Sequence, residues 1–298
     1  MLIKKGLDKY LNHGAVSGVT DKDCVFSATI ASISPIKDVL SEEDMDLLYS
    51  FSAIFNSKLF TYVLLMTSSS FGAGRNRANF KEFFEMLFVS DDELINLSKK
   101  IHLEKKENLD FDDSSVKKLE EKLYNLFQLS QIEKELISYA LEVSIPVMKR
   151  LDRHDLELPE IFKPIQPRNK DILISYCKVY VNHFGKRFSE TESYFNIDAY
   201  ISADFIAVHF RVSKKRTEQI KIDYNSDLNT TISKIGGLGI EEVSTNLFVQ
   251  QDIRGFNKNS FYVIKPNISK NWHLALAHSD LTEFIEAIAK SEIKKVKQ

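Results

Sequence analysis

Two arginines follow a run of serines and glycines, and their types and spacing make this the stretch of the sequence best suited to bind a ligand. The run TSSSFGAG covers residues 67–74, and the polar residues after it are Arg75, Asn76, Arg77, Asn79 and Lys81. Arg and Asn make bidentate contacts with guanine and adenine edges, and Arg and Lys also bind phosphate groups. Glycines let a backbone approach a ligand closely. These residues fit either a nucleic-acid contact or a solvated loop that only turns the chain.

The same run lacks the residues of the known nucleotide loops. A phosphate loop needs a glycine, four residues and then Gly-Lys before Ser or Thr, and no lysine occupies that place. The dinucleotide fingerprint needs three glycines after a strand, whereas Gly72 and Gly74 stand alone after a predicted helix. The GGLG at 236–239 is predicted to be a turn for the same reason. We therefore expect no nucleotide cofactor.

Other catalytic or metal-binding patterns are missing. The seven histidines show no metal-ligand pairing, and the chain contains neither a Gly-x-Ser-x-Gly nor a His-Glu-x-x-His motif. No acidic pair is singled out by its context. The sequence therefore predicts no metal site, no cofactor and no catalytic residues.

Two further basic clusters lie in the last third of the chain. Lys214, Lys215 and Arg216 belong to RVSKKR at 211–216, which fits either a basic surface or the solvated end of an edge strand. The stretch 252–273 carries a second set: Arg254, Lys265 and the only tryptophan, Trp272. Basic groups interleaved with aromatics suit a nucleic-acid surface. The alternative for this stretch is a hairpin whose tryptophan closes the core.

The composition predicts a folded chain in a reducing compartment. Of the 298 residues, 43% are hydrophobic and 11% aromatic, which is ample for a buried core. Cys24 and Cys177 lie far apart and form no disulfide framework, and the N-terminus lacks the apolar core of a signal peptide. We therefore expect a cytoplasmic location. The net charge of −2 and the pI of 6.4 mean that any DNA binding has to come from local basic patches or a basic partner.

The first third is predicted to contain a strand and one long helix. Residues 24–34, CVFSATIASIS, are rich in β-branched and small residues and are expected to form a strand that Pro35 ends. A helix is expected over 41–66, with Ser41 as N-cap and Asp44 in an acidic first turn. Its purely apolar part, 62–66, is far shorter than the roughly 20 residues of a membrane span. We therefore expect a buried helix and no membrane segment.

Helices are predicted in the middle third, and helices with strands in the last third. Residues 114–150 contain two amphipathic stretches, and a capping box from Ser130 to Glu133 opens the second. Prolines within 158–170 mark the best domain boundary. Beyond it the patterns predict four elements: a helix over 171–185, a strand or hairpin over 196–214, a hairpin over 244–267 with its turn at 255–259, and a helix over 280–298.

Several segments resemble a known family when they are taken in order. They are LIKKGL at 2–7, CVFSATIASIS at 24–34, AIFNSKLFTYVLLMTSSSFGAGRNR at 53–77 and NFKEFFEMLF at 79–88. This order is similar to the target-recognition region that follows the catalytic domain in adenine-specific DNA methyltransferases of restriction and phage-defence systems. The specific matches all lie within 53–77: Asn56, Ser57, Leu59, Thr67, Ser68, Ser69, Ser70, Gly72 and Arg75. Phe71 stands where the family usually has tryptophan, and the helices around 123–141 and the last third resemble the family more weakly.

The resemblance implies a recognition module without its catalytic half. Those enzymes hold the target base with Asn/Asp-Pro-Pro-Tyr/Phe and bind S-adenosylmethionine through a glycine-rich loop, and neither motif occurs here. The chain is therefore expected not to methylate alone, and its implied partners are double-stranded DNA and a catalytic methyltransferase subunit or domain. The alternative is a protein-interaction or assembly subunit of a phage-defence complex without direct DNA contact.

The patterns and the resemblance together predict an α+β fold in three parts. Residues 1–90 are expected to form an α/β part like a target-recognition domain, and residues 91–160 a helical spacer. Residues 161–298 are expected to form an α+β domain with antiparallel strands. Arg75 and Arg77 are the leading DNA-binding candidates, followed by Asn76, Asn79 and Lys81.

Overall fold

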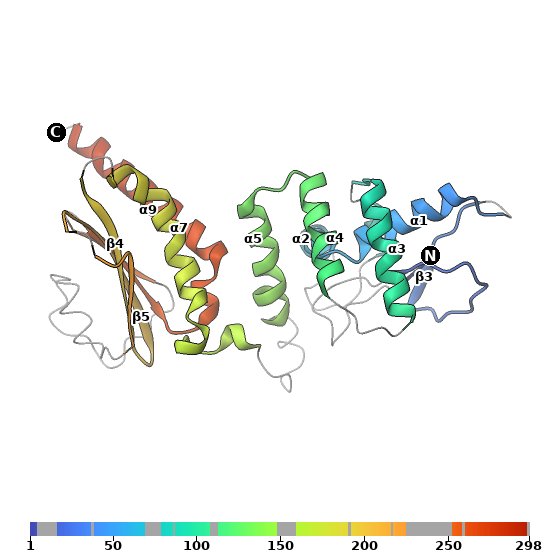
Figure 1. Ribbon diagram of the computed structural model, residues 1–298, viewed down its shortest axis with the longest axis horizontal. Coiled ribbons are helices and arrows are strands. Elements are labelled where there is room, and N and C mark those ends of the chain that lie inside the picture. Colours follow the sequence, from blue (N-terminus) through green and yellow to red (C-terminus); the bar gives the residue numbers. More distant parts are fainter. Residues whose placement is uncertain are drawn as a thin grey trace. The chain divides into compact units, whose positions relative to one another are not determined.

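The protein has an α+β fold that divides into two compact units, Met1–Glu157 and Leu158–Gln298 (Figure 1). The computed structural model describes these residues: 1–4, 17–36, 39–68, 79–85, 87–107, 113–147, 159–189, 192–215, 217–224, 252–257 and 260–296.

The first unit is mostly helical and carries a small antiparallel sheet. Its helices are α1 (Glu42–Phe55), α2 (Lys58–Thr67), α3 (Asp92–Lys106), α4 (Asp113–Leu126) and α5 (Gln131–Tyr139), with a 3₁₀ helix η1 (Phe80–Phe84) and a π-helical stretch at Ala140–Ser144. The strands β1 (Leu2–Lys4), β2 (Ser17–Gly18) and β3 (Ile30–Ser32) pair in the order β2-β1-β3.

One hydrophobic core joins the regions expected as a recognition domain and a helical spacer. It contains residues of β1, α1, α2, η1, α3 and α4, among them Ile3, Phe55, Phe60, Leu94 and Leu123. The parts expected as 1–90 and 91–160 therefore share their buried side chains. No described helix has the length and apolar character that a membrane crossing requires.

The helix expected over 41–66 is in fact two helices. It begins as expected. The Ser41 side chain accepts a hydrogen bond from the backbone N–H of Asp44, and the Asp44 carboxylate accepts one from the backbone N–H of Ser41. It breaks at Asn56, the C-cap of α1, and Ser57, whose hydroxyl accepts the N–H of Phe60 at 3.0 Å and donates to the carbonyl of Ile54 at 2.7 Å. These bonds satisfy backbone groups at both helix ends, so the chain can turn inside an apolar run.

The strand expected over 24–34 is confirmed only at Ile30–Ser32. Residues 24–29 are outside any strand, and Val25 and Phe26 expose 105% and 41% of their surface. β-propensity reflects the fit to a half-buried pleated surface. No sheet buries these side chains, so the β-branched composition alone does not produce a strand.

The second unit packs two helices on a five-stranded mixed sheet. The strands are β4 (Tyr194–Ile201), β5 (Phe205–Ser213), β6 (Ile220–Asp223), β7 (Ile253–Asn257) and β8 (Ser260–Pro266), in the order β6-β4-β5-β8-β7. Helices α7 (Asp171–Ser189) and α9 (Leu274–Val296) lie along the same face (Figure 1). The short 3₁₀ helices are η3 (Glu160–Phe162), η4 (Pro167–Asn169) and η5 (Ser269–Trp272).

The stretch expected as a strand or hairpin over 196–214 forms the antiparallel pair β4–β5, and the described part of the hairpin expected over 244–267 is the antiparallel pair β7–β8. The turn assigned to 255–259 is wrong over 255–257, because β7 continues to Asn257 and Gly255 lies inside it opposite Tyr262, whereas residues 258–259 lie outside the described residues. A Cβ atom on Gly255 would come within 2.1 Å of the Tyr262 hydroxyl oxygen. The glycine is therefore needed where the tyrosine ring crosses the strand, as is typical of glycine inside strands.

Candidate nucleic-acid interface at the end of helix α2

The leading candidate residues lie at or next to the segment 69–78. Arg75, Asn76 and Arg77 fall within that segment, outside the described residues. Asn79 and Lys81 are described, and both are exposed. The structure therefore shows the two ends of the candidate segment and the surface from which it departs.

Both ends of the segment are held by one carboxylate oxygen. Oε2 of Glu82 accepts a hydrogen bond from the Ser68 hydroxyl at 2.7 Å and another from the backbone N–H of Asn79 at 2.8 Å. The ten residues between Ser68 and Asn79 thus begin and end at one side chain. A hydrogen bond to an ionised carboxylate is stronger than one between two neutral groups.

Aromatic packing fixes the position of this carboxylate. Glu82 belongs to η1, and its neighbour Phe83 is buried against Phe55 of α1 and Phe60 of α2, with ring centroids 5.6 and 5.3 Å away. Phe55 and Phe60 are themselves 4.8 Å apart. Close aromatic groups of this kind stabilise beyond the area they bury. The base of the segment is therefore a packed aromatic cluster.

A buried carboxylate fixes the start of α2 in the same way. Glu120 of α4 is 6% exposed, and its Oε1 accepts the backbone N–H of Lys58, the first residue of α2, at 2.7 Å. Its other oxygen, Oε2, is buried without a hydrogen-bond partner in the part of the chain that the structure describes. Burial raises the pKa of Glu120 to about 7.

Asn56 joins the small sheet to the break between α1 and α2. Its Oδ1 accepts the backbone N–H of Ser17 at 2.7 Å, and its Nδ2 donates to the Ser17 carbonyl at 3.0 Å and to the Ser52 hydroxyl at 3.2 Å. Ser52 also contacts Nε2 of His102, on α3, at 3.2 Å. Burial lowers the pKa of His102, which favours its neutral form in this network.

Replacing Asn56 with alanine should destabilise the first unit by about 2–3 kcal/mol, because it leaves both backbone groups of the buried Ser17 unsatisfied. Urea unfolding followed by circular dichroism measures this loss. Asn125→Ala is the matched control: Asn125 is exposed on α4, and its loss should change stability by less than about 0.5 kcal/mol. Equal stability of the two variants would contradict the assigned role of Asn56.

Comparison with known proteins adds no relative. No protein-family model, curated protein or solved structure matches the chain. The resemblance to adenine-specific DNA methyltransferases therefore rests on the residues of this chain alone.

The basic cluster after β5 is exposed in the second unit. Lys214 and Lys215 directly follow Ser213, the last residue of β5, and both are exposed, whereas Arg216 lies outside the described residues. This agrees with both interpretations of RVSKKR, a basic surface and a solvated strand end.

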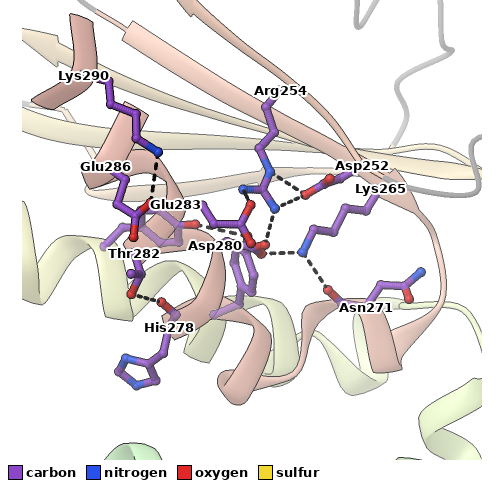
Figure 2. A network of polar contacts seen from close by, with 12 residues as sticks. Asp252, Arg254, Lys265, Asn271, His278, Asp280, Thr282, Glu283, Glu286 and Lys290 are labelled. Carbon is purple, nitrogen blue, oxygen red and sulfur yellow. Dashed lines mark hydrogen bonds and ion pairs between the residues drawn. The ribbon is translucent and has the colours of Figure 1, made fainter. Parts of the chain in front are cut away.

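The other basic candidates of the second unit belong to a buried polar network (Figure 2). The Lys265 ammonium pairs with Oδ2 of Asp280 and lies 5.7 Å from the centre of the Trp272 ring. Arg254 pairs with Oδ1 of Asp280 at 2.7 Å, with Asp252 at 2.5 Å and with Glu283 at 2.5 Å.

These contacts support the alternative in which the tryptophan closes the core. Lys265 is 6% exposed and Trp272 is fully buried, so in this fold neither presents its side chain to a nucleic acid. The alternation of β8 places Lys265 on the same face as Phe261 and Val263, toward α9. Among the described residues, no three acidic, histidine or cysteine side chains are grouped to hold a metal ion.

Proposed function

We propose that this protein is the target-recognition module, or a split specificity subunit, of a cytoplasmic adenine-specific DNA methyltransferase or restriction-modification system. It binds double-stranded DNA, directs a separate catalytic subunit or domain to its site, and does not methylate alone. The observation that carries the proposal is the hydrogen bonding of Ser68 and Asn79 to one oxygen of Glu82.

This arrangement suits a recognition loop. A loop that carries arginines can contact bases only if a scaffold fixes where it begins and ends, and binding residues commonly lie on loops placed by rigid elements. Here Glu82 and the aromatic cluster of Phe55, Phe60 and Phe83 supply that scaffold. Asn79 and Lys81 stand exposed at its rim, and Arg75 and Arg77 lie in the segment between.

The test is an Arg75→Ala/Arg77→Ala double variant in a fluorescence-anisotropy titration of duplex DNA at several salt concentrations. Each lost phosphate contact should flatten the slope of log affinity against log salt by roughly 0.9. We expect weaker binding and a slope that is flatter by the equivalent of one or two phosphate contacts. A Lys117→Ala/Lys118→Ala variant removes two exposed lysines from α4 and controls for the loss of charge. An unchanged affinity and salt slope in the arginine variant would contradict the assignment.

A second candidate function, an assembly subunit without DNA contact, is favoured by an exposed apolar surface beside η1. We call this the phenylalanine surface; its centre is Phe51, whose ring is 4.5 Å from Phe88 and 6.5 Å from Phe84. Leu47, Phe84, Leu87 and Phe88 expose 42, 49, 77 and 41% of their surface. Contiguous apolar side chains of this kind are typical of protein-protein contacts.

DNA binding by the isolated chain separates the two functions. A recognition module binds duplex DNA by itself, and Leu87→Glu leaves that affinity unchanged. An assembly subunit binds no DNA alone and instead binds a catalytic methyltransferase subunit through the phenylalanine surface. In a pull-down with that subunit, Leu87→Glu then abolishes binding.

A further inference from the structure

A cavity with mixed polar and apolar lining opens in the second unit where β4 and β6 separate. It has a volume of about 360 Å³ and is lined by Gly185, Ser193, Tyr194, Phe195, Asn196, Thr217 and Gln219. The two strands run parallel and pair only from Ile197 and Ile220 onwards. Residues 193–196 and 217–219 therefore flank an opening that extends the line of the sheet, with Gly185 of α7 at its side. Its volume lies within the roughly 300–1,000 Å³ of small-ligand sites.

The backbone of Phe195 faces this opening. In a strand, alternate residues direct their N–H and C=O groups to the same side. The N–H of Ile197 points toward β6, since it donates to the Gln219 carbonyl at 2.9 Å, and Phe195 belongs to the same alternate set. The pairing with β6 has not yet begun at Phe195. The backbone N–H and C=O of Phe195 therefore face the cavity as a hydrogen-bond donor and acceptor, and the pairing of β4 with β5 holds them in place.

Gly185 borders the cavity without a side chain. It lies inside the 19-residue helix α7, where glycine costs roughly 0.5–1 kcal/mol relative to alanine. A Cβ atom there would meet Nε2 of Gln219 and Cγ1 of Val181 at 3.8 Å, an ordinary contact distance. Packing alone would therefore tolerate alanine, and a longer side chain would extend into the cavity.

The lining residues of the cavity supply amides, hydroxyls and aromatic rings. Gln219 and Thr217 are exposed at its rim, and Tyr194 is 38% exposed. Lys186 and Arg187 follow Gly185 in the sequence, Lys214 and Lys215 lie between β5 and Thr217, and the acidic residues next to lining positions are Glu192 and Glu218. Lys214 and Lys215 leave the sheet beside the start of β4, because Ser213 pairs with Tyr194.

We propose that this cavity binds a nucleotide, with the base edge at the Phe195 backbone and Gln219 and the phosphate at Lys214 and Lys215. A base edge offers adjacent donors and acceptors that match a backbone N–H and C=O pair and a carboxamide. The tyrosine ring offers a stacking surface, and lysine ammonium groups bind phosphate as point charges. The ligand is a free mononucleotide or a nucleotide of a single strand.

The test is isothermal titration of the full chain with AMP, adenosine, inorganic phosphate and a 5′-phosphorylated ten-nucleotide single strand. AMP should bind at least tenfold more tightly than adenosine or phosphate. Gly185→Leu should weaken AMP at least tenfold, whereas Gly185→Ala should retain binding within about threefold and raise thermal stability. Lys214→Ala/Lys215→Ala should weaken AMP while leaving adenosine unchanged, and this variant tests the site even if Gly185→Leu folds poorly.

The competing outcomes separate the possibilities. Binding of the strand but not of AMP would assign the site to nucleic acid, and binding of AMP alone would assign it to a free nucleotide. Equal affinity for phosphate and AMP, unchanged AMP affinity in both Gly185→Leu and the lysine variant, or no nucleotide binding at millimolar concentration would overturn the proposal. The Arg75→Ala/Arg77→Ala variant should bind AMP normally, so failure of the DNA-recognition function leaves this test intact.

Discussion

Replacing Asp280 with asparagine is expected to destabilise the second unit by about 3–5 kcal/mol. The Asp280 side chain is 5% exposed and is the shared counter-ion of Lys265 and Arg254. It also accepts the Tyr176 hydroxyl at 2.6 Å, and burial holds the pKa of Tyr176 well above its ordinary value, so the hydroxyl remains a donor. Asparagine keeps the shape but removes the charge, which leaves the buried Lys265 ammonium without a carboxylate.

Two further variants show whether the lost charge causes the effect. Glu283→Gln removes another carboxylate from Arg254, but Glu283 is 58% exposed, so we expect a loss below about 1 kcal/mol. Asp280→Asn/Lys265→Met removes both buried charges and should recover much of the lost stability, because uncharged replacements of a buried pair are often neutral.

Trp272 reports this unit selectively. It is the only tryptophan of the chain and is fully buried in the second unit, so urea unfolding followed by its fluorescence measures that unit. A loss below about 1 kcal/mol for Asp280→Asn, or a double variant as unstable as the single one, would refute the role of the network.

Sequence patterns predicted most described elements of the second unit, although not β6, because those elements follow simple periods. The helix predicted over 171–185 corresponds to α7, and the strand or hairpin predicted over 196–214 corresponds to the hairpin of β4 and β5. The alternation of β8 also indicated that Lys265 faces the core, because Lys265, Phe261 and Val263 occupy alternate positions on one face of the strand. The basic composition of the stretch obscured this signal. Its partner, Asp280, lies 15 residues away on α9, and no local pattern connects the two residues.

The first unit was harder to predict because local chemistry interrupts its patterns. Apolar residues keep a helical period through Phe51, Ile54, Phe55 and Leu59, so the period alone predicts one helix. Asn56 and Ser57 are favoured cap residues, and their hydrogen bonds end one helix and start the next. The role of Glu82 depends on a fold that brings Ser68 and Asn79 together, which residue types alone do not predict.

Gly185 was not among the residues singled out from the sequence, although its place inside the helix predicted over 171–185 is a signal for this site. An isolated glycine within a helical pattern costs stability and often has a packing or functional reason. The backbone of Phe195 gave no such signal, because its availability depends on where the pairing of β4 with β6 begins.

Replacing Glu120 with glutamine is expected to stabilise the first unit by about 3 kcal/mol at pH 8 and to change little at pH 4.5. Burial raises the pKa of Glu120 from 4.5 to about 7 in the folded chain, and each pKa unit corresponds to roughly 1.4 kcal/mol. Between pH 4.5 and about pH 7 the folded state therefore keeps a proton on Glu120 that the unfolded state has lost. Stability therefore falls as the pH rises from about 4.5 to about 7, and the loss is complete above that window. Glutamine cannot ionise, and its carbonyl oxygen still accepts the Lys58 N–H.

The measurement is urea unfolding of both proteins across pH 4.5–8, followed by circular dichroism, since Trp272 does not report the first unit. The difference between the proteins isolates Glu120 from His102, whose lowered pKa acts in the opposite direction because its contribution is lost as the pH falls. Glu121→Gln is the matched control: Glu121 is 62% exposed and pairs with Lys134 at 2.9 Å, so the pH dependence of stability should stay as in the unmodified chain. If Glu120→Gln also left that dependence unchanged, the buried carboxylate would be ionised throughout the range, and its capping of α2 would then use a full negative charge.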